Sequence, residues 1–267
     1  MANLHIDTQC GWKYKWTEEE DNIVRKYYPI NGWEKVHELL PNRKKAGIQC
    51  RAKKLQVKQF QYNSRYFENI DNCKKAYWLG FLYADGYVTT ENRWGLELQY
   101  EDIGHMENFL NDMQCNIPIK VRERNGHKYC LFQIKNSKMY NDLVQNGIVP
   151  QKTYKIEFPS FLKADETMLF SFICGFFDGD GTYFYKSSKS REVSCVCKVR
   201  EFVESIQDIL RNKGIESHIK EQYELFYLRI YKKTDMQKFI EIMLNLPVNM
   251  LERKKCKAIE ILEYCLA

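Results

Sequence analysis

Residues 77–86 read YWLGFLYADG, and residues 172–181 repeat the pattern as FICGFFDGDG. Gly80 and Gly175 occupy the same place in the two copies, and a small residue follows each of them four positions later. Small residues at this spacing lie on one face of a helix, where they let a second helix backbone approach closely. The repeat therefore predicts two helices packed along these faces, in a chain built from two units related by a pseudo-twofold axis.

An aspartate stands at the end of each predicted helix. Asp85 and Asp180 are each followed by a glycine, the residue that commonly ends a helix. A carboxylate there faces the negative end of the helix dipole, and two carboxylates brought together repel each other. A structural role explains this pair poorly. A shared site for divalent cations explains it well, because Mg²⁺ prefers hard oxygen ligands.

Two simpler interpretations of the motif are weaker. Asp-Gly is a common turn dipeptide, so one copy alone would mean little. The segment that begins at Asp178 resembles a calcium loop, but Lys189 stands at the twelfth position, where an EF-hand requires glutamate. Two copies in identical register favour the shared cation site.

Similar helix and strand patterns follow each motif copy. The Asn125-Gly126 pair is a strong hairpin signal. After the first copy we expect strands at 87–90, 95–100, 119–124 and 128–135, and helices at 103–114 and 138–146. After the second copy we expect strands at 183–187, 192–198, 217–221 and 226–231, and helices at 201–213 and 235–244. Each unit is then α-β-β-α-β-β-α, which predicts an α+β fold with antiparallel sheets.

The first sixty residues are more basic than the rest and predict a small N-terminal three-helix domain. They hold twelve Lys and Arg against seven Asp and Glu, so they carry +5 of the net charge of +6. Thr17 and Glu20 form a capping-box pattern that begins a helix, Pro29 is expected to end it, and short helices are expected at 33–40 and 44–57. A basic last helix is typical of helix-turn-helix DNA readers, and a small bundle with a solvated basic face is the simpler alternative. The expected DNA contacts are Lys44, Lys45, Arg51, Lys53 and Lys54.

Two family resemblances divide the chain. The stretch WTEEED at residues 16–21, together with Trp33 and Gln49-Cys50-Arg51, resembles a Myb/SANT-like repeat. The two motif copies resemble a single-chain, two-motif LAGLIDADG homing endonuclease. The expected domains are a DNA-binding helical domain at 1–58, a linker at 59–72, and LAGLIDADG-like units at 73–156 and 157–267.

The second resemblance implies a metal centre. In that family the paired motif helices form the interface, eight antiparallel strands form a saddle over DNA, and the last aspartate of each motif binds metal. It assigns Asp85 and Asp180 as catalytic ligands of Mg²⁺ or Mn²⁺, with Ca²⁺ as a non-catalytic substitute. Ala84 and Gly179 are then expected to lend backbone carbonyls to the metal.

The resemblance also implies further active-site residues. Lys152 and Lys254 match the lysines that the family places after the last helix of each unit, where they could stabilise charge at the scissile phosphate. Gln99 stands where the family often keeps a polar active-site residue. Its expected counterpart near residues 195–197 is not polar, which predicts two unequal half-sites.

The strand face away from the helices is expected to meet DNA. Alternation along the strands places Gln133, Lys135, Arg229 and Tyr231 on that face. Arg122, Arg124, Lys186, Lys198 and Arg200 are further candidates for contacts with phosphates or guanine edges.

Composition excludes other classes of protein. The longest apolar run, at residues 76–84, is too short to span a membrane, the N-terminal pattern is not that of a secretory signal, and the ten cysteines include no C-x-x-C pair typical of zinc sites. We expect an intracellular monomer (cytoplasmic, phage-encoded or organellar) that promotes intron homing by cutting double-stranded DNA at a long asymmetric target. An RNA maturase that binds intron RNA and a cleavage-inactive DNA-binding regulator are the alternatives.

Overall fold

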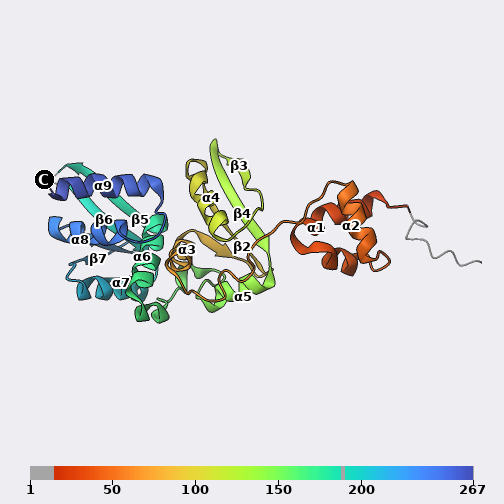
Figure 1. Cartoon of the computed structure of the whole chain (residues 1–267). Helices are drawn as coiled ribbons and strands as arrows, with labels where there is room; N and C mark the ends of the chain where they lie inside the picture. Colours follow the sequence, from red (N-terminus) through yellow and green to blue (C-terminus); the bar gives the residue numbers. More distant parts are fainter. Residues whose placement is uncertain (1–14, 188–189, 267) are drawn as a thin grey trace, which may run out of the picture. The chain divides into compact units, whose positions relative to one another are not determined.

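The computed structural model describes residues 15–187 and 190–266, so residues 1–14 of the expected first domain lie outside the described part (Figure 1). The chain forms two compact units, the first ending at Tyr62 and the second beginning at Asn63. Both motif copies belong to the second unit. None of the helices in the described ranges has the length and apolar character needed to cross a membrane.

The first unit is built on α1 (Glu18–Leu39), which a break at Gly32 divides into two helical segments, and on α2 (Lys45–Lys54), so the predicted three-helix arrangement is present. The predicted capping box is present, because the Thr17 side chain accepts from the Glu20 N–H and the Glu20 carboxylate accepts from the Thr17 N–H. The prediction that Pro29 ends the first helix was wrong. The helical backbone continues past Pro29 and breaks at Gly32, where φ is 71°. Glycine takes this left-handed conformation without strain, so the break falls there.

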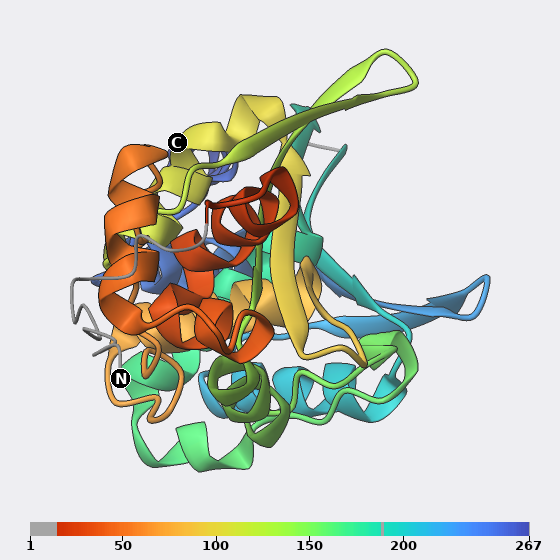
Figure 2. The ribbon, with the colours of Figure 1, turned by 90° about the vertical axis from the view of Figure 1, so that its right-hand side faces the viewer.

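The second unit contains two four-stranded antiparallel sheets, which agrees with the predicted architecture. The strands of the first sheet lie in the order β1 (Gly86–Val88), β2 (Arg93–Gln99), β4 (His127–Lys135) and β3 (Lys120–Arg124). The second sheet has the equivalent order β5 (Gly181–Ser187), β6 (Ser190–Cys197), β8 (Leu225–Ile230) and β7 (His218–Gln222). In Figure 2 the β3–β4 and β7–β8 hairpins extend beyond the body of this unit as two arms.

The remaining helices surround these sheets. They are α3 (Cys73–Ala84), α4 (Ile103–Asp112), α5 (Ser137–Gln145), α6 (Glu166–Asp180), α7 (Arg200–Asn212), α8 (Lys233–Leu244) and α9 (Glu252–Leu266), with short 3₁₀ turns at Tyr100–Asp102, Lys152–Tyr154 and Ser160–Ala164. The sequence prediction missed α9, which packs on α8 and β5. Its buried apolar positions Ala258, Ile261 and Cys265 recur at helical spacing, so the sequence did carry a signal for this helix.

The α3 and α6 helices carry the two motif copies and pack against each other between the two sheets (Figure 1). A methyl group added at Gly80 would lie 2.0 Å from the Phe172 carbonyl oxygen, and one added at Gly175 would lie 1.9 Å from the Tyr77 carbonyl oxygen. The two backbones therefore touch at the glycines, as the repeat predicts. This contact joins the two repeats into one unit.

Candidate active site at the ends of two paired helices

Two aspartates lie where α3 and α6 end together. Asp85 follows the last residue of α3, and Asp180 is the last residue of α6. A methyl group added at Gly179 would lie 2.2 Å from Ala84 Cβ and 3.3 Å from Asp85 Oδ2, so the two helix ends are in contact. The helix packing thus brings the predicted carboxylates to one place.

The surroundings of both carboxylates disfavour their charged forms. Desolvation raises the pKa of Asp85 to about 6, although part of its side chain reaches solvent, and the charge of Asp180 adds to the increase. Desolvation also raises the pKa of Asp180. Two neighbouring carboxylates of like charge favour the binding of a cation.

The two predicted lysines occupy equivalent places beside the aspartates. Lys152 Nζ donates to the carbonyl oxygen of Ala84 at 2.5 Å and also to that of Tyr83. Lys254 Nζ donates to the carbonyl oxygens of Phe177 and Gly179 at 2.9 and 2.8 Å. The carbonyls at the C-terminal end of a helix carry partial negative charge, which attracts these ammonium groups.

Burial opposes the charge on both lysines. It lowers the pKa of Lys152 and of Lys254 to about 8, while the neighbouring carboxylates favour the charged forms. The carbonyls of Ala84 and Gly179, expected to face a metal, bind ammonium groups in this structure. These two carbonyl oxygens therefore bind cationic groups in this structure.

The donor set fits Mg²⁺ or a similar hard cation. Within residues 15–187 and 190–266, no group of three or more His, Cys, Asp or Glu side chains is arranged to hold a metal ion. Asp85 and Asp180 would thus supply the side-chain ligands, with carbonyls, water and a bound phosphate completing the shell. Mg²⁺ is often bound by one or two carboxylates together with substrate phosphates.

The structure corrects the expected counterpart of Gln99. Gly86 pairs with Leu96 in the first sheet, and Gly181 pairs with Cys195 in the second. Three residues further along, Gln99 is therefore equivalent to Lys198, which is polar. Lys198 Nζ donates to the hydroxyl of Tyr154 at 2.7 Å. The two repeats therefore differ at this position, with the Gln99 amide in the first and the Lys198 ammonium group in the second. Tyr154, which is 66% exposed, is a neighbour of Lys198 that the sequence prediction missed.

The outer face of the first sheet carries the predicted polar residues. Trp94 and Phe132 are buried and in contact with each other. Gln133 and Lys135 pair with Gly95 and Arg93 on the opposite face. Arg122 and Arg124 pair with Tyr129 and His127, which places them on the same face as Gln133. Contact between DNA and this face remains a prediction.

The second sheet presents an equivalent face with more internal pairing. Arg229 pairs in register with Ser194, and its guanidinium lies 3.7 Å from Glu192. Tyr231, 40% exposed, follows directly after β8. Lys186 is exposed on β5. Arg200 begins α7, where its side chain pairs with Glu204 at 2.8 Å.

The first unit gives Arg51 a different role from the predicted one. Its guanidinium donates to both carboxylate oxygens of Asp21, which is 4% exposed. This bidentate pair neutralises a buried carboxylate and ties α2 to α1, which gives Arg51 a structural role. Contact between Arg51 and phosphate stays a prediction. The other four candidates, Lys44, Lys45, Lys53 and Lys54, have exposed side chains.

A buried polar chain behind the site was not predicted. Asp178 is fully buried, and its Oδ2 accepts from the Tyr77 hydroxyl at 2.6 Å and from the Leu251 N–H at 2.8 Å. The Tyr77 hydroxyl lies 3.0 Å from His105 Nε2. Burial, followed by the charges of Arg253 and Lys254, lowers the pKa of His105 to about 3 and keeps it neutral. The sequence signal for this buried polar chain was an aspartate, Asp178, within the apolar run of the second motif.

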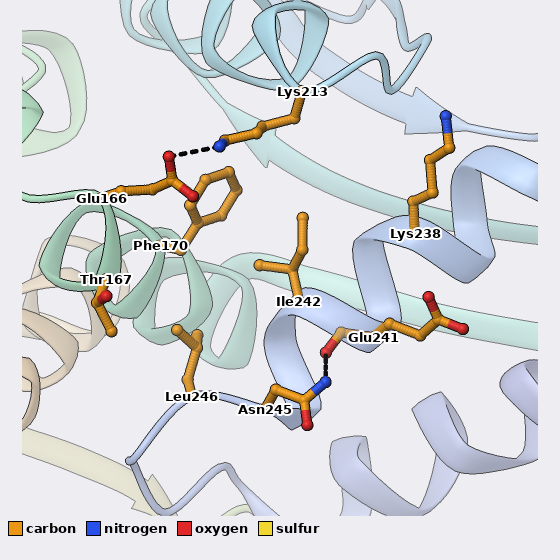
Figure 3. A pocket seen from close by; sticks show the side chains of 9 residues that line it. All are labelled: Glu166, Thr167, Phe170, Lys213, Lys238, Glu241, Ile242, Asn245 and Leu246. Atoms are coloured by element: carbon orange, nitrogen blue, oxygen red, sulfur yellow. Dashed lines mark hydrogen bonds and ion pairs between the residues drawn. The ribbon is translucent and has the colours of Figure 1, made fainter.

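The hollow drawn in Figure 3 is separate from this site. It has a volume of about 460 Å³ and lies among α6, α7 and α8, next to the Glu166–Lys213 ion pair. Glu166 begins α6 and Asp180 ends it, so the two residues are roughly 20 Å apart along the helix axis. The hollow is therefore not part of the carboxylate site.

Comparison with known proteins finds a family model that matches part of the chain. Residues 167–243, from α6 to α8, match the model of the LAGLIDADG-like domain. The homing endonuclease I-WcaI bound to its DNA recognition sequence is similar in structure, with a TM-score of 0.55 and 17% identity over 71% of this chain and 90% of that chain. The meganuclease I-SmaMI bound to uncleaveable DNA has a TM-score of 0.51 and 12% identity over 72% of this chain and 89% of that chain. No curated protein sequence matches. These likenesses show a shared fold.

Proposed function

We propose that this chain, which carries a LAGLIDADG-like domain on a fold shared with homing endonucleases, is a metal-dependent endonuclease that cuts both strands of DNA at a specific site. The meeting of Asp85 and Asp180 at the ends of α3 and α6 carries the proposal. Each repeat contributes one carboxylate and one lysine. Two such sets suit the hydrolysis of two phosphodiesters, one in each strand.

The residues divide the chemistry between them. Asp85 and Asp180, with the carbonyls of Ala84 and Gly179, would hold Mg²⁺ or Mn²⁺, which lowers the pKa of a bound water and neutralises charge on the phosphate. Lys152 and Lys254, each bound to the end of a motif helix, place a positive charge beside the developing negative charge. With a pKa of about 8, each lysine is mostly protonated at pH 7.

The partner we propose is double-stranded DNA laid across the outer faces of the two sheets. Arg122, Arg124, Gln133 and Lys135 lie on the face of the first sheet away from the buried aromatic residues. Both carboxylates come from one chain, so a monomer holds the complete site. The first unit, with its exposed lysines on and beside α2, would extend the contact and raise affinity by linkage.

The proposal is tested by selecting the DNA target and then cutting it. The full chain is used to select sequences from a random duplex library in Ca²⁺, and the selected duplex is incubated with Mg²⁺ or Mn²⁺. We expect both strands to be cut, and we expect Asp85→Asn and Asp180→Asn to bind the duplex without cutting it.

Two other outcomes would contradict the proposal. Specific binding of a duplex that stays intact with either metal would indicate a cleavage-inactive regulator. Binding of structured intron RNA in preference to any duplex would indicate a maturase.

A further inference from the structure

We propose that Asp178 and Tyr83 are positioning residues, each of which holds the chain segment that brings a lysine to the site. The two residues are equivalent, because 95 positions separate Tyr83 from Asp178 as they separate Asp85 from Asp180. The inference rests on the proposed function, since it concerns the same active site. Neither side chain belongs to the set of groups that would meet metal or phosphate.

Asp178 is bonded directly to the turn that precedes α9. Its Oδ2 accepts from the Leu251 N–H at 2.8 Å, and the Leu251 carbonyl accepts from the Lys254 N–H at 2.9 Å. Lys254 Nζ then reaches the carbonyls of Phe177 and Gly179, which stand on either side of Asp178. The start of α9, the lysine and the end of α6 thus form one closed set of contacts.

Tyr83 holds the equivalent segment of the first repeat, but as a hydrogen-bond donor where Asp178 is an acceptor. Its hydroxyl donates to the carbonyl oxygen of Asn146, the residue that directly follows α5, at 2.7 Å. A methyl group added at Gly147, where φ is +94°, would lie 1.9 Å from this hydroxyl oxygen, so the turn lies directly against the ring. Lys152 follows this turn and returns to the carbonyls of Tyr83 and Ala84.

These contacts matter because each lysine lies close to an irregular turn of the chain. Lys152 lies in a short 3₁₀ turn, and Lys254 lies in the first turn of α9. A long flexible side chain has many rotamers, and ordering it costs entropy unless its backbone is held. A misplacement of about 1 Å can reduce a catalytic rate about 100-fold. One tether on each segment would set each lysine separately.

The first test measures the exposure of the two lysines without DNA. The folded full chain is treated with acetic anhydride, and acetylation of Lys152 and Lys254 is measured by mass spectrometry. Loss of one hydrogen bond, worth about 1.4 kcal/mol, should raise local opening about tenfold. We expect Asp178→Leu to raise labelling of Lys254 and leave Lys152 unchanged, and Tyr83→Phe to do the reverse.

Two further variants separate positioning from general loosening. Asp178→Asn keeps an oxygen acceptor for the Leu251 N–H and should bring Lys254 labelling well below that of Asp178→Leu, since both variants lose the charge that raises the pKa of Lys254 and only the leucine also loses the hydrogen bond. Tyr66→Phe is the matched control, because the buried Tyr66 hydroxyl has no hydrogen-bond partner in the described structure. Unchanged labelling in both Tyr83→Phe and Asp178→Leu, or an equal increase at both lysines in each, would overturn the proposal.

The second test uses cleavage. On a duplex labelled separately on each strand, Asp178→Leu and Tyr83→Phe should slow opposite strands through kcat, with KM unchanged. Equal slowing of both strands by each variant would overturn the proposal. If the wild-type chain cuts no DNA, the proposed function fails, while the labelling test still decides whether these residues position the lysines.

Discussion

Replacing Gly175 with alanine should separate the paired helices that build the candidate site. The added methyl group would lie 1.9 Å from the Tyr77 carbonyl oxygen, whereas ordinary contacts begin at 3.4 Å. The difference of about 1.5 Å must be taken up by moving one helix backbone, because the clashing atom belongs to the main chain and has no other rotamer. The helices cannot separate that far without loosening the buried side chains around them.

The size of the effect follows from two opposing contributions. Overpacking a core costs about 1–3 kcal/mol, and a backbone clash belongs at the upper end, about 3 kcal/mol. Alanine is favoured over glycine within a helix by about 1 kcal/mol. The free energy of unfolding should therefore fall by about 2 kcal/mol, which for a unit of this size lowers Tm by about 4–8 °C.

Urea unfolding followed by circular dichroism measures this loss. Gly104→Ala is the matched control, because Gly104 lies in α4 and a methyl group there meets no atom within 4 Å in the described structure. That control should be unchanged or slightly more stable. Wild-type stability in Gly175→Ala would show that the helices are not in backbone contact and would refute the reasoning about the site.

Four further results are expected. Asp85→Asn should stabilise the second unit at pH 7 by about 1 kcal/mol in urea unfolding. The raised pKa of the partly exposed Asp85 carboxyl means that its ionisation costs stability as pH rises from 3.8 through about 6. The gain should therefore be absent at pH 4. Between pH 7 and pH 5 the free energy of unfolding should fall by about 2 kcal/mol less in His105→Gln than in the wild type. The lowered pKa of His105 contributes stability that disappears as pH falls from 6.5 toward 3, and the variant lacks this contribution. Arg51→Met should destabilise the first unit by about 3 kcal/mol in calorimetry by leaving Asp21 buried without its partner, and adding Asp21→Asn should recover part of the loss. Arg122→Gln should reduce the slope of log Kd against log salt by about one for duplex DNA if this side chain meets a phosphate, and an unchanged slope would exclude that contact.

The paired helices and the two sheets could be predicted because their signals are local and repeated. Gly80 and Gly175 mark a face on which only a second backbone fits, and Asn125-Gly126 marks a hairpin. These patterns depend on spacing within a few residues, and the second copy confirms the first. The aspartates then followed from their place at the helix ends.

Features that depend on partners far away in the sequence could not be predicted. Asp178 meets Leu251, and Arg51 meets Asp21, but no spacing rule connects such positions. The place of the break in α1 was missed for a different reason. Pro29 removes one hydrogen bond and is tolerated, whereas Gly32 allows the backbone conformation that a sharp bend needs.

The paired ends of α3 and α6, called the helix seam here, are separate from the sheet faces, and this separation has an evolutionary consequence. The aspartates and lysines are held by the ends of α3 and α6, while Gln133 and Arg229 stand on strands of two different sheets. Substitutions on those strands can accumulate one at a time without moving the seam. Under the proposed function, a lineage built this way can change its DNA target through these strands while it keeps the residues at the helix ends, and laboratory selection can use the same freedom.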